Sequence, residues 1–131
     1  MIGLDTNVLV RYVVQDDPIQ TASAVKLIDS LSAEDRGFVS IVVIAELVWV
    51  LDASYHLKKE NIQRVLETLL GSKEIAVEQS ETVLQAFRLF KLAEADFADF
   101  LIERSGNGAG CDHTLTFDHK AARSAGMRLL K

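Results

Sequence analysis

The sequence contains a single cysteine, Cys111, among its 131 residues. One cysteine excludes an internal disulfide and agrees with a reducing cytoplasm, where we expect the protein to act. No apolar run approaches the roughly 18 residues of a membrane-spanning helix, and no basic stretch followed by a long apolar core indicates a secretory signal. We therefore expect no membrane partner.

Basic residues are also in the minority, because 14 Lys and Arg against 19 Asp and Glu give a formal net charge of −5. This balance argues against a protein that coats nucleic-acid phosphates, since such proteins are normally basic. It does not exclude a nuclease, because catalytic acids bias the count and a bound metal ion reverses their local charge. The glycine-rich phosphate loop of Walker-type nucleotide hydrolases is absent as well.

The remaining composition is that of an ordinary globular chain, with 49% apolar and 25% charged residues. Short apolar runs alternate with helical patterns, which predicts a mostly parallel sheet with helices on both faces. We expect a single α/β domain over residues 1–131. Strands are expected at residues 2–4, 38–39, 75–77, 114–117 and 127–130. Helices are expected at residues 8–14, 41–55, 59–70, 80–93 and 97–105, with a flexible loop at 106–110.

A further helix is predicted to begin at Pro18. Proline is favoured at the first position of a helix, and the preceding Asp17 is a suitable cap. We expect Ile19 and Ile28 to face inward from this helix. The long helix that follows residues 38–39 is expected to be capped by Ser40.

Two of the predicted strands deliver an aspartate at their carboxyl ends. Residues 2–4 lead to Asp5, and residues 114–117 lead to Asp118. Open α/β sheets bind their ligands at this edge. A carboxylate there is costly to bury unless a cation meets it. A turn aspartate is common on its own, so the signal lies in the combination with other acids.

Glu46 is the only charged residue in the run 41–51. A helix this apolar is expected to be buried nearly all round, so that Glu46 points into the core or into a pocket cut in it. Two interpretations stay open. Glu46 is either half of a buried ion pair with an arginine, or a metal ligand.

Asp96, Asp99 and Glu103 follow one another at the spacing i, i+3 and i+7, which places them on one helix face. Like charges at this spacing destabilise a helix by roughly 0.2–0.5 kcal/mol per pair. Capping and the helix dipole can explain Asp96, and a solvated acidic face can explain Glu103. Neither explains Asp99 well.

Carboxylates, hydroxyls and water are the ligands that suit Mg²⁺ or Mn²⁺. Such an ion holds a phosphate, lowers the pKa of a bound water and neutralises the leaving oxygen. A zinc site made by Cys111, His113 and His119 is disfavoured, because the tetrahedral ligand spacing is missing.

These pieces together resemble the PIN-domain ribonucleases, and among them the VapC-type toxins of toxin–antitoxin pairs. The matching segments are Leu4-Asp5-Thr6-Asn7, Ala45-Glu46-Leu47, Asp96-Phe97-Ala98-Asp99-Phe100-Leu101-Ile102 and Thr116-Phe117-Asp118. Their order and spacing extend the resemblance over the whole chain. The sequence departs from the family at Phe100, where a small alanine is common, and this departure bears on local packing and pocket depth.

The resemblance implies a catalytic and metal-binding site made by Asp5, Glu46, Asp99 and Asp118, with Asp96 as an auxiliary acid. It implies supporting hydrogen bonds from Thr6, Asn7, Ser40 or Thr116. It also implies Mg²⁺- or Mn²⁺-dependent cleavage of RNA by activated water, leaving a 3′-hydroxyl and a 5′-phosphate. A homodimer and a cognate antitoxin protein are the implied partners. Lys120 and Arg123 are the basic residues nearest in sequence to Asp118.

Two alternatives remain open at this level. Asp5 could be the phosphorylated nucleophile of a haloacid-dehalogenase-like phosphatase, but that chemistry needs a second aspartate two residues on, where this chain has Asn7. The chain could also be a catalytically silent PIN-like binding module. The presence of all four expected acids argues against a degenerate site.

Overall fold

A computed structural model describes all residues from Met1 to Lys131, in two compact units, Met1–Glu78 and Gln79–Lys131. The strands are β1 (Ile2–Gly3), β2 (Gly37–Val39), β3 (Ile75–Val77), β4 (Leu115–Thr116) and β5 (Arg128–Leu129). The helices are α1 (Thr6–Val14), α2 (Pro18–Asp29), α3 (Ile41–Ala53), α4 (Lys59–Gly71), α5 (Ser80–Leu92), α6 (Phe97–Gly108) and α7 (His119–Ser124). None of these helices is both long enough and apolar enough to cross a membrane.

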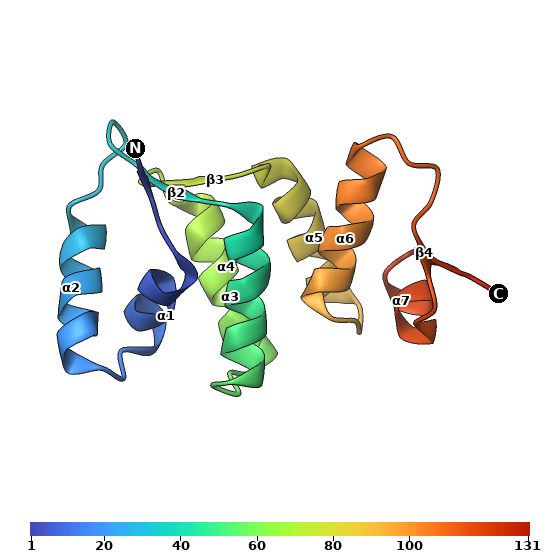
Figure 1. Ribbon diagram of the computed structural model, residues 1–131, viewed down its shortest axis with the longest axis horizontal. Coiled ribbons are helices and arrows are strands. Elements are labelled where there is room, and N and C mark those ends of the chain that lie inside the picture. The colour runs from blue at the N-terminus through green and yellow to red at the C-terminus, as the bar shows by residue number, and fades with distance from the viewer. The chain divides into compact units, whose positions relative to one another are not determined.

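The first unit is built on a three-stranded parallel sheet in the order β1-β2-β3. Parallel neighbours need a crossover, which α1 and α2 supply between β1 and β2, and α3 and α4 between β2 and β3. Figure 1 shows these strands at one side of the unit with α1 to α4 alongside. In register, Gly3 lies opposite Phe38, and Phe38 lies opposite Ala76. The predicted parallel α/β organisation is confirmed.

Helix caps in this unit follow the sequence signals. Asp17 Oδ1 accepts hydrogen bonds from the backbone N–H of Ile19 at 3.1 Å and of Gln20 at 3.0 Å, and Pro18 is the first helical residue. Ser40 Oγ accepts from Val43 N–H at 3.2 Å and caps α3. Such caps satisfy backbone donors that have no partner within the helix.

The core of the first unit is aliphatic. Leu9 of α1, Ile44 and Leu47 of α3 and Leu66 of α4 are almost fully buried. Gly37 of β2 completes this packing, because a Cβ added there would lie 2.8 Å from Leu4 Cδ1. Side chains packed to this density fix the directions of α1 and α3, and these two helices carry the acids of the first unit.

The second unit packs α5 against α6 around aromatic rings and adds the parallel pair β4-β5, which is joined through α7. The ring of Phe90 lies edge-on to Phe97, with centroids 5.5 Å apart, and to Phe100, with centroids 6.5 Å apart. Phe100 is only 1% exposed. Its bulk therefore fills the core of this unit.

Two local expectations were wrong. Residues 106–108 continue helix α6 instead of forming a flexible loop, and Ala109 N–H still bonds to Ser105 O at 3.0 Å. A Cβ at Gly106 would lie 2.8 Å from Thr114 Oγ1, so any larger residue here would make that side chain shift. Ile19, expected to face inward, is 81% exposed.

Candidate functional site

Asp5 lies at the joint between β1 and α1. Its backbone is extended, and its Oδ1 accepts a hydrogen bond at 2.7 Å from the N–H of Thr6, so that Asp5 is the N-cap of α1. This position agrees with the expectation that the first strand delivers an aspartate at its carboxyl end. One cap bond leaves the other carboxylate oxygen of Asp5 able to bind a ligand.

Glu46 of α3 is joined to the same turn through Thr6, whose hydroxyl donates a hydrogen bond to Glu46 Oε1. Thr6 is the only buried polar side chain of the chain, at 6% exposed. Its N–H holds Asp5 and its hydroxyl holds Glu46. A single buried threonine therefore connects the two acids of the first unit.

The expectation that α3 is buried nearly all round was wrong. Val42 is 70% exposed and Trp49 is 67% exposed, and Glu46 is exposed between them on the face formed by positions i, i+4 and i+7. The structure also gives Glu46 no cationic partner. The interpretation as half of a buried ion pair therefore fails, since Glu46 is neither buried nor paired.

Asp118 ends the segment after β4 as the N-cap of α7. Its Oδ1 accepts hydrogen bonds from the N–H groups of Lys120 at 2.8 Å and Ala121 at 3.4 Å, while Asp118 N–H donates to Thr116 Oγ1 at 3.0 Å. Thr116 is thus one of the expected supporting residues that does form a hydrogen bond. The side chain of Asp118 is placed by its own cap geometry.

Asp99 lies in the first turn of α6, and its N–H donates to the backbone carbonyl of Asp96 at 3.0 Å. Asp96 is the N-cap residue by position, although its side chain makes no capping hydrogen bond. Burial, followed by the negative charges of Asp96 and Asp118, raises the pKa of the Asp99 carboxyl above its ordinary value. The charges of Asp96 and Asp118 therefore both act on the Asp99 carboxyl.

The predicted acids form two groups, one in each unit. The first group is Asp5 and Glu46, and the second is Asp99 and Asp118 with Asp96. Within either unit, no three His, Cys, Asp or Glu side chains are grouped closely enough to hold a metal ion. Within its own unit none of these acids has an ion-pair partner, because the ion pairs join Asp35, Asp16 and Glu103 to other cations. Unpaired carboxylates beside threonine hydroxyls are a donor set of the kind that suits Mg²⁺ or Mn²⁺.

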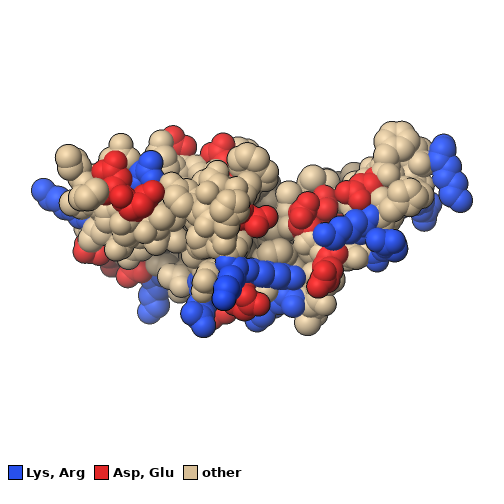
Figure 2. Space-filling model, turned by 90° about the horizontal axis from the view of Figure 1, so that it is seen from below, with Lys and Arg blue, Asp and Glu red and all other residues tan.

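Basic side chains are scattered among acidic ones on the face drawn in Figure 2, without forming one continuous band. Lys120 is near enough to Asp99 for its charge to oppose the rise of the Asp99 pKa. The sequence did not distinguish Arg11 from ordinary solvated charges, yet its guanidinium has three side-chain partners, Asp16, Gln20 and Tyr55. No spacing rule relates these residues, because they come from three different segments.

Two comparisons relate the chain to known proteins. A VapC ribonuclease from Aquifex aeolicus (strain VF5) is 27% identical to the chain over 119 residues, which cover 89% of this chain and 87% of that protein. Residues 2–126 match the PIN domain family. That match includes every acid of the two groups. The chain therefore belongs to the PIN domain family.

Proposed function

We propose that this chain is a metal-dependent ribonuclease that acts in the cytoplasm as the toxin of a VapC-type toxin–antitoxin pair. The observation that carries the proposal is the presence, in a chain of the PIN domain family, of four acids without ion-pair partners at the predicted positions. The likeness to a VapC ribonuclease supports the choice of RNA as substrate.

We further propose that the two units form one domain over residues 1–131, in which Asp5, Glu46, Asp99 and Asp118 hold one Mg²⁺ or Mn²⁺ site, with Asp96 as an auxiliary acid. The bound ion would supply a Lewis acid that acidifies the attacking water and neutralises charge on the leaving oxygen. Hydrolysis would leave a 3′-hydroxyl and a 5′-phosphate.

Neighbouring residues of the chain orient the proposed metal-binding carboxylates. Thr6 positions Asp5 through its N–H and Glu46 through its hydroxyl. Thr116 and the cap geometry of α7 position Asp118. Ligands held by such hydrogen bonds lose less entropy when a metal binds, and loss of supporting partners typically costs about 10–100-fold in affinity or activity.

The test is RNA hydrolysis by the purified chain with Mn²⁺ and with EDTA. We expect cleavage in Mn²⁺, no cleavage in EDTA, recovery when Mn²⁺ is added back, and little cleavage in Ca²⁺. Activity should follow the protein peak on gel filtration, at the mass of the homodimer that we also propose. Full cleavage after exhaustive chelation would contradict the metal mechanism. RNA binding without cleavage would instead indicate the silent binding module.

A cognate antitoxin is expected to silence the nuclease by placing an Arg or Lys among the carboxylates. An apolar side chain of the antitoxin would be anchored nearby, in a cavity of about 380 Å³ in the first unit whose walls include Leu9, Tyr12, Val13, Val65 and Leu69. Burial of such an anchor stabilises a complex by roughly 1.5–3 kcal/mol. The co-purified pair should therefore be inactive towards RNA. A bound partner that leaves cleavage unchanged would rule out this form of inhibition.

A further inference from the structure

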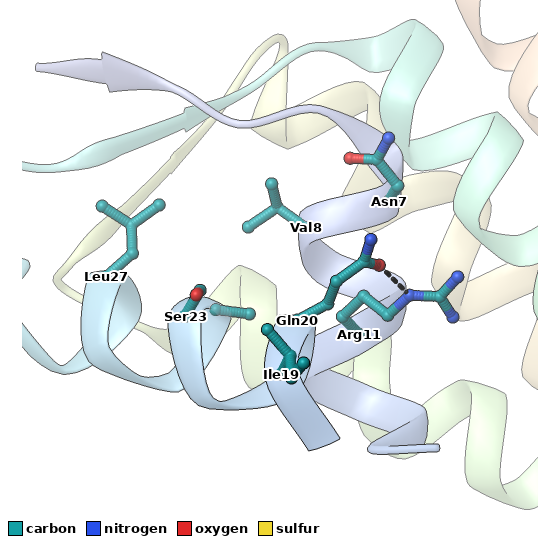
Figure 3. A pocket seen from close by; sticks show the side chains of 8 residues that line it. Asn7, Val8, Arg11, Ile19, Gln20, Ser23 and Leu27 are labelled. Carbon is teal, nitrogen blue, oxygen red and sulfur yellow. Dashed lines mark hydrogen bonds between the residues drawn. The ribbon is translucent and has the colours of Figure 1, made fainter. Parts of the chain in front are cut away.

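A second cavity, of about 300 Å³, lies between α1 and α2 in the first unit (Figure 3). It begins at Asn7, two residues beyond Asp5, and continues one helical turn along α1 to Arg11. Gln20 and Ser23 line it from α2. A volume of this size is at the lower end for small-molecule sites and suits one planar ring system rather than an extended ligand.

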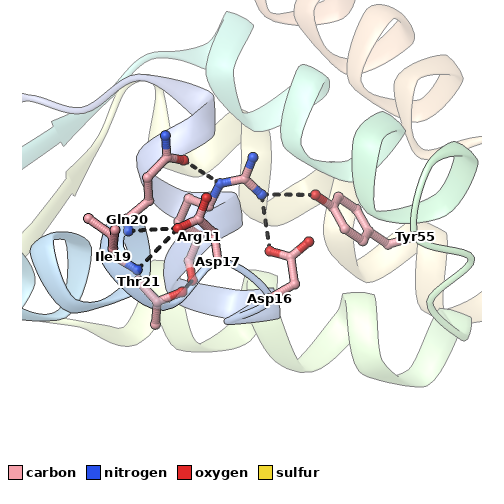
Figure 4. A network of polar contacts seen from close by, with 7 residues as sticks. All are labelled: Arg11, Asp16, Asp17, Ile19, Gln20, Thr21 and Tyr55. Atoms are coloured by element: carbon pink, nitrogen blue, oxygen red, sulfur yellow. Dashed lines mark hydrogen bonds and ion pairs between the residues drawn. The ribbon is translucent and has the colours of Figure 1, made fainter.

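Three side chains hold Arg11 beside this cavity by hydrogen bonds (Figure 4). Its Nε donates to Gln20 Oε1 at 2.7 Å, and its Nη1 donates to Asp16 Oδ1 and to Tyr55 OH, each at 3.1 Å. These bonds occupy Nε and Nη1 and leave the Nη2 amino group without a protein partner. A donor fixed in advance by three partners pays little ordering entropy when a ligand binds.

The ion pair with Asp16 also decides the charge of the ligand. Asp16 compensates the positive charge of Arg11, so the cavity offers N–H donors with little net charge. A phosphate would have to compete with Asp16 for the same guanidinium. An uncharged ring with hydrogen-bond acceptors on its edge has no such competitor.

Half of the residues that line the cavity are apolar. Val8 and Leu27 face it from the two helices, and the strongly exposed Ile19 lies at its rim. An isoleucine at the second position of a helix, exposed beside a cavity with polar donors, offers a flat apolar surface to a ring. Proteins hold a nucleobase taken out of its stack by hydrogen bonds to its edge and by aromatic or apolar side chains against its faces.

We propose that this cavity binds a guanine base of the RNA substrate. Arg11 Nη2 and Gln20 Nε2 are donors only, since Gln20 Oε1 is already used by Arg11. Guanine carries two adjacent acceptors, N7 and O6, and arginine is their most frequent partner. This inference rests on the proposed ribonuclease function, because it assigns a subsite of that substrate.

The position of the cavity along α1 relates the bound nucleotide to the proposed cleavage site. Asp5 caps the helix and Arg11 lies six residues further on, about 9 Å along the helix axis. We therefore assign the cavity to a nucleotide near the phosphate that the acids would cleave. The cavity would select the cleavage site without taking part in the chemistry.

The first experiment is a nuclear magnetic resonance titration of the full-length, isotope-labelled chain in EDTA with the four nucleoside 5′-monophosphates. Guanosine monophosphate is expected to shift the amides of Asn7 and Ser23 and the Nε–H of Arg11, and the other three to bind at least about tenfold more weakly. No cleavage is involved, so this result is independent of nuclease activity. Equal binding of all four nucleotides would overturn the assignment of guanine.

The second experiment maps cleavage sites on random RNA with Mn²⁺. Ser23→Leu fills the cavity from an exposed helical position, and Ala22→Leu on the same helix adds comparable bulk outside the cavity. We expect Ser23→Leu to abolish a guanine preference beside the cut while Ala22→Leu retains it. Cleavage by the parent with no base preference there would overturn the inference and leave the proposed function intact. If guanosine monophosphate binds in the cavity but the chain cleaves no RNA, the proposed ribonuclease function is wrong and the cavity is still a guanine site.

Discussion

Replacing Asp99 by Asn is expected to lower the rate of RNA cleavage by at least about a hundredfold, because loss of mere supporting partners at metal sites already costs about 10–100-fold. The metal-free variant should be at least as stable as the parent at pH 7. Burial and the charges of Asp96 and Asp118 raise the pKa of Asp99, so its ionised form destabilises the fold. Asparagine removes that charge and keeps the shape.

The stability difference between Asp99→Asn and the parent should depend on pH in one direction. A carboxyl whose pKa is raised by folding adds stability below its unfolded pKa, and this stability is lost as the pH rises through the folded pKa. The stability advantage of Asp99→Asn over the parent in EDTA should therefore shrink as the pH is lowered from 7. Urea unfolding at several pH values measures it.

Glu94→Gln is the matched control for Asp99→Asn, because it removes one exposed negative charge from the same unit outside the proposed site. Glu94→Gln should retain RNA cleavage. Its difference from the parent in the free energy of unfolding should not shrink in the same way as the pH is lowered. If the Asp99→Asn protein cleaves RNA at a rate within a few fold of the parental rate, Asp99 is not a catalytic residue.

Replacing Glu46 by Gln should abolish cleavage with little effect on the metal-free fold. A buried ion pair broken on one side costs roughly 3–5 kcal/mol, but Glu46 is exposed and unpaired. Gln Oε1 can still accept the hydrogen bond from Thr6. We therefore expect the free energy of unfolding in EDTA to change by less than about 0.5 kcal/mol.

Added Mn²⁺ should increase the difference in stability between the parent and the Glu46→Gln variant. At a hundredfold excess over its dissociation constant, Mn²⁺ should stabilise the parent by roughly 2.7 kcal/mol through mass action, and the Glu46→Gln variant by less. Melting curves with EDTA and with Mn²⁺ show this difference. Asp52→Asn, an exposed acid on the same helix, is the control and should respond like the parent. A Glu46→Gln protein that melts far below the parent in EDTA yet cleaves RNA would show a structural role.

Local chemistry made much of the fold predictable. Asp17 before Pro18 and Ser40 before an apolar run cap helices as expected, because a cap needs only neighbours in sequence. The strand Ile75–Val77 also has its predicted bounds. The candidate acids were proposed from similar local signals, because Asp5 and Asp118 follow strands and Glu46 stands alone in an apolar helix. Asp99 was proposed from its spacing on one helix face with Asp96 and Glu103.

The exposure of side chains was less predictable, because it depends on which other elements pack against each helix face. The apolar helix α3 was expected to be buried all round, yet Val42 and Trp49 are exposed beside Glu46. Glycines near position 106 suggested a loop, but Gly106 serves a close approach of Thr114 within a helix. The partners of Arg11 were also invisible in the sequence, since Asp16, Gln20 and Tyr55 share no periodicity with it.

We propose that acids of both units hold one metal ion. A titration with Mn²⁺, followed by electron paramagnetic resonance without RNA, tests it in the parent, in Asp5→Asn and in Asp99→Asn. We predict one site per chain in the parent and at least about tenfold weaker binding in each variant, although the two substitutions lie in different units. Parental affinity in either variant would contradict a shared site.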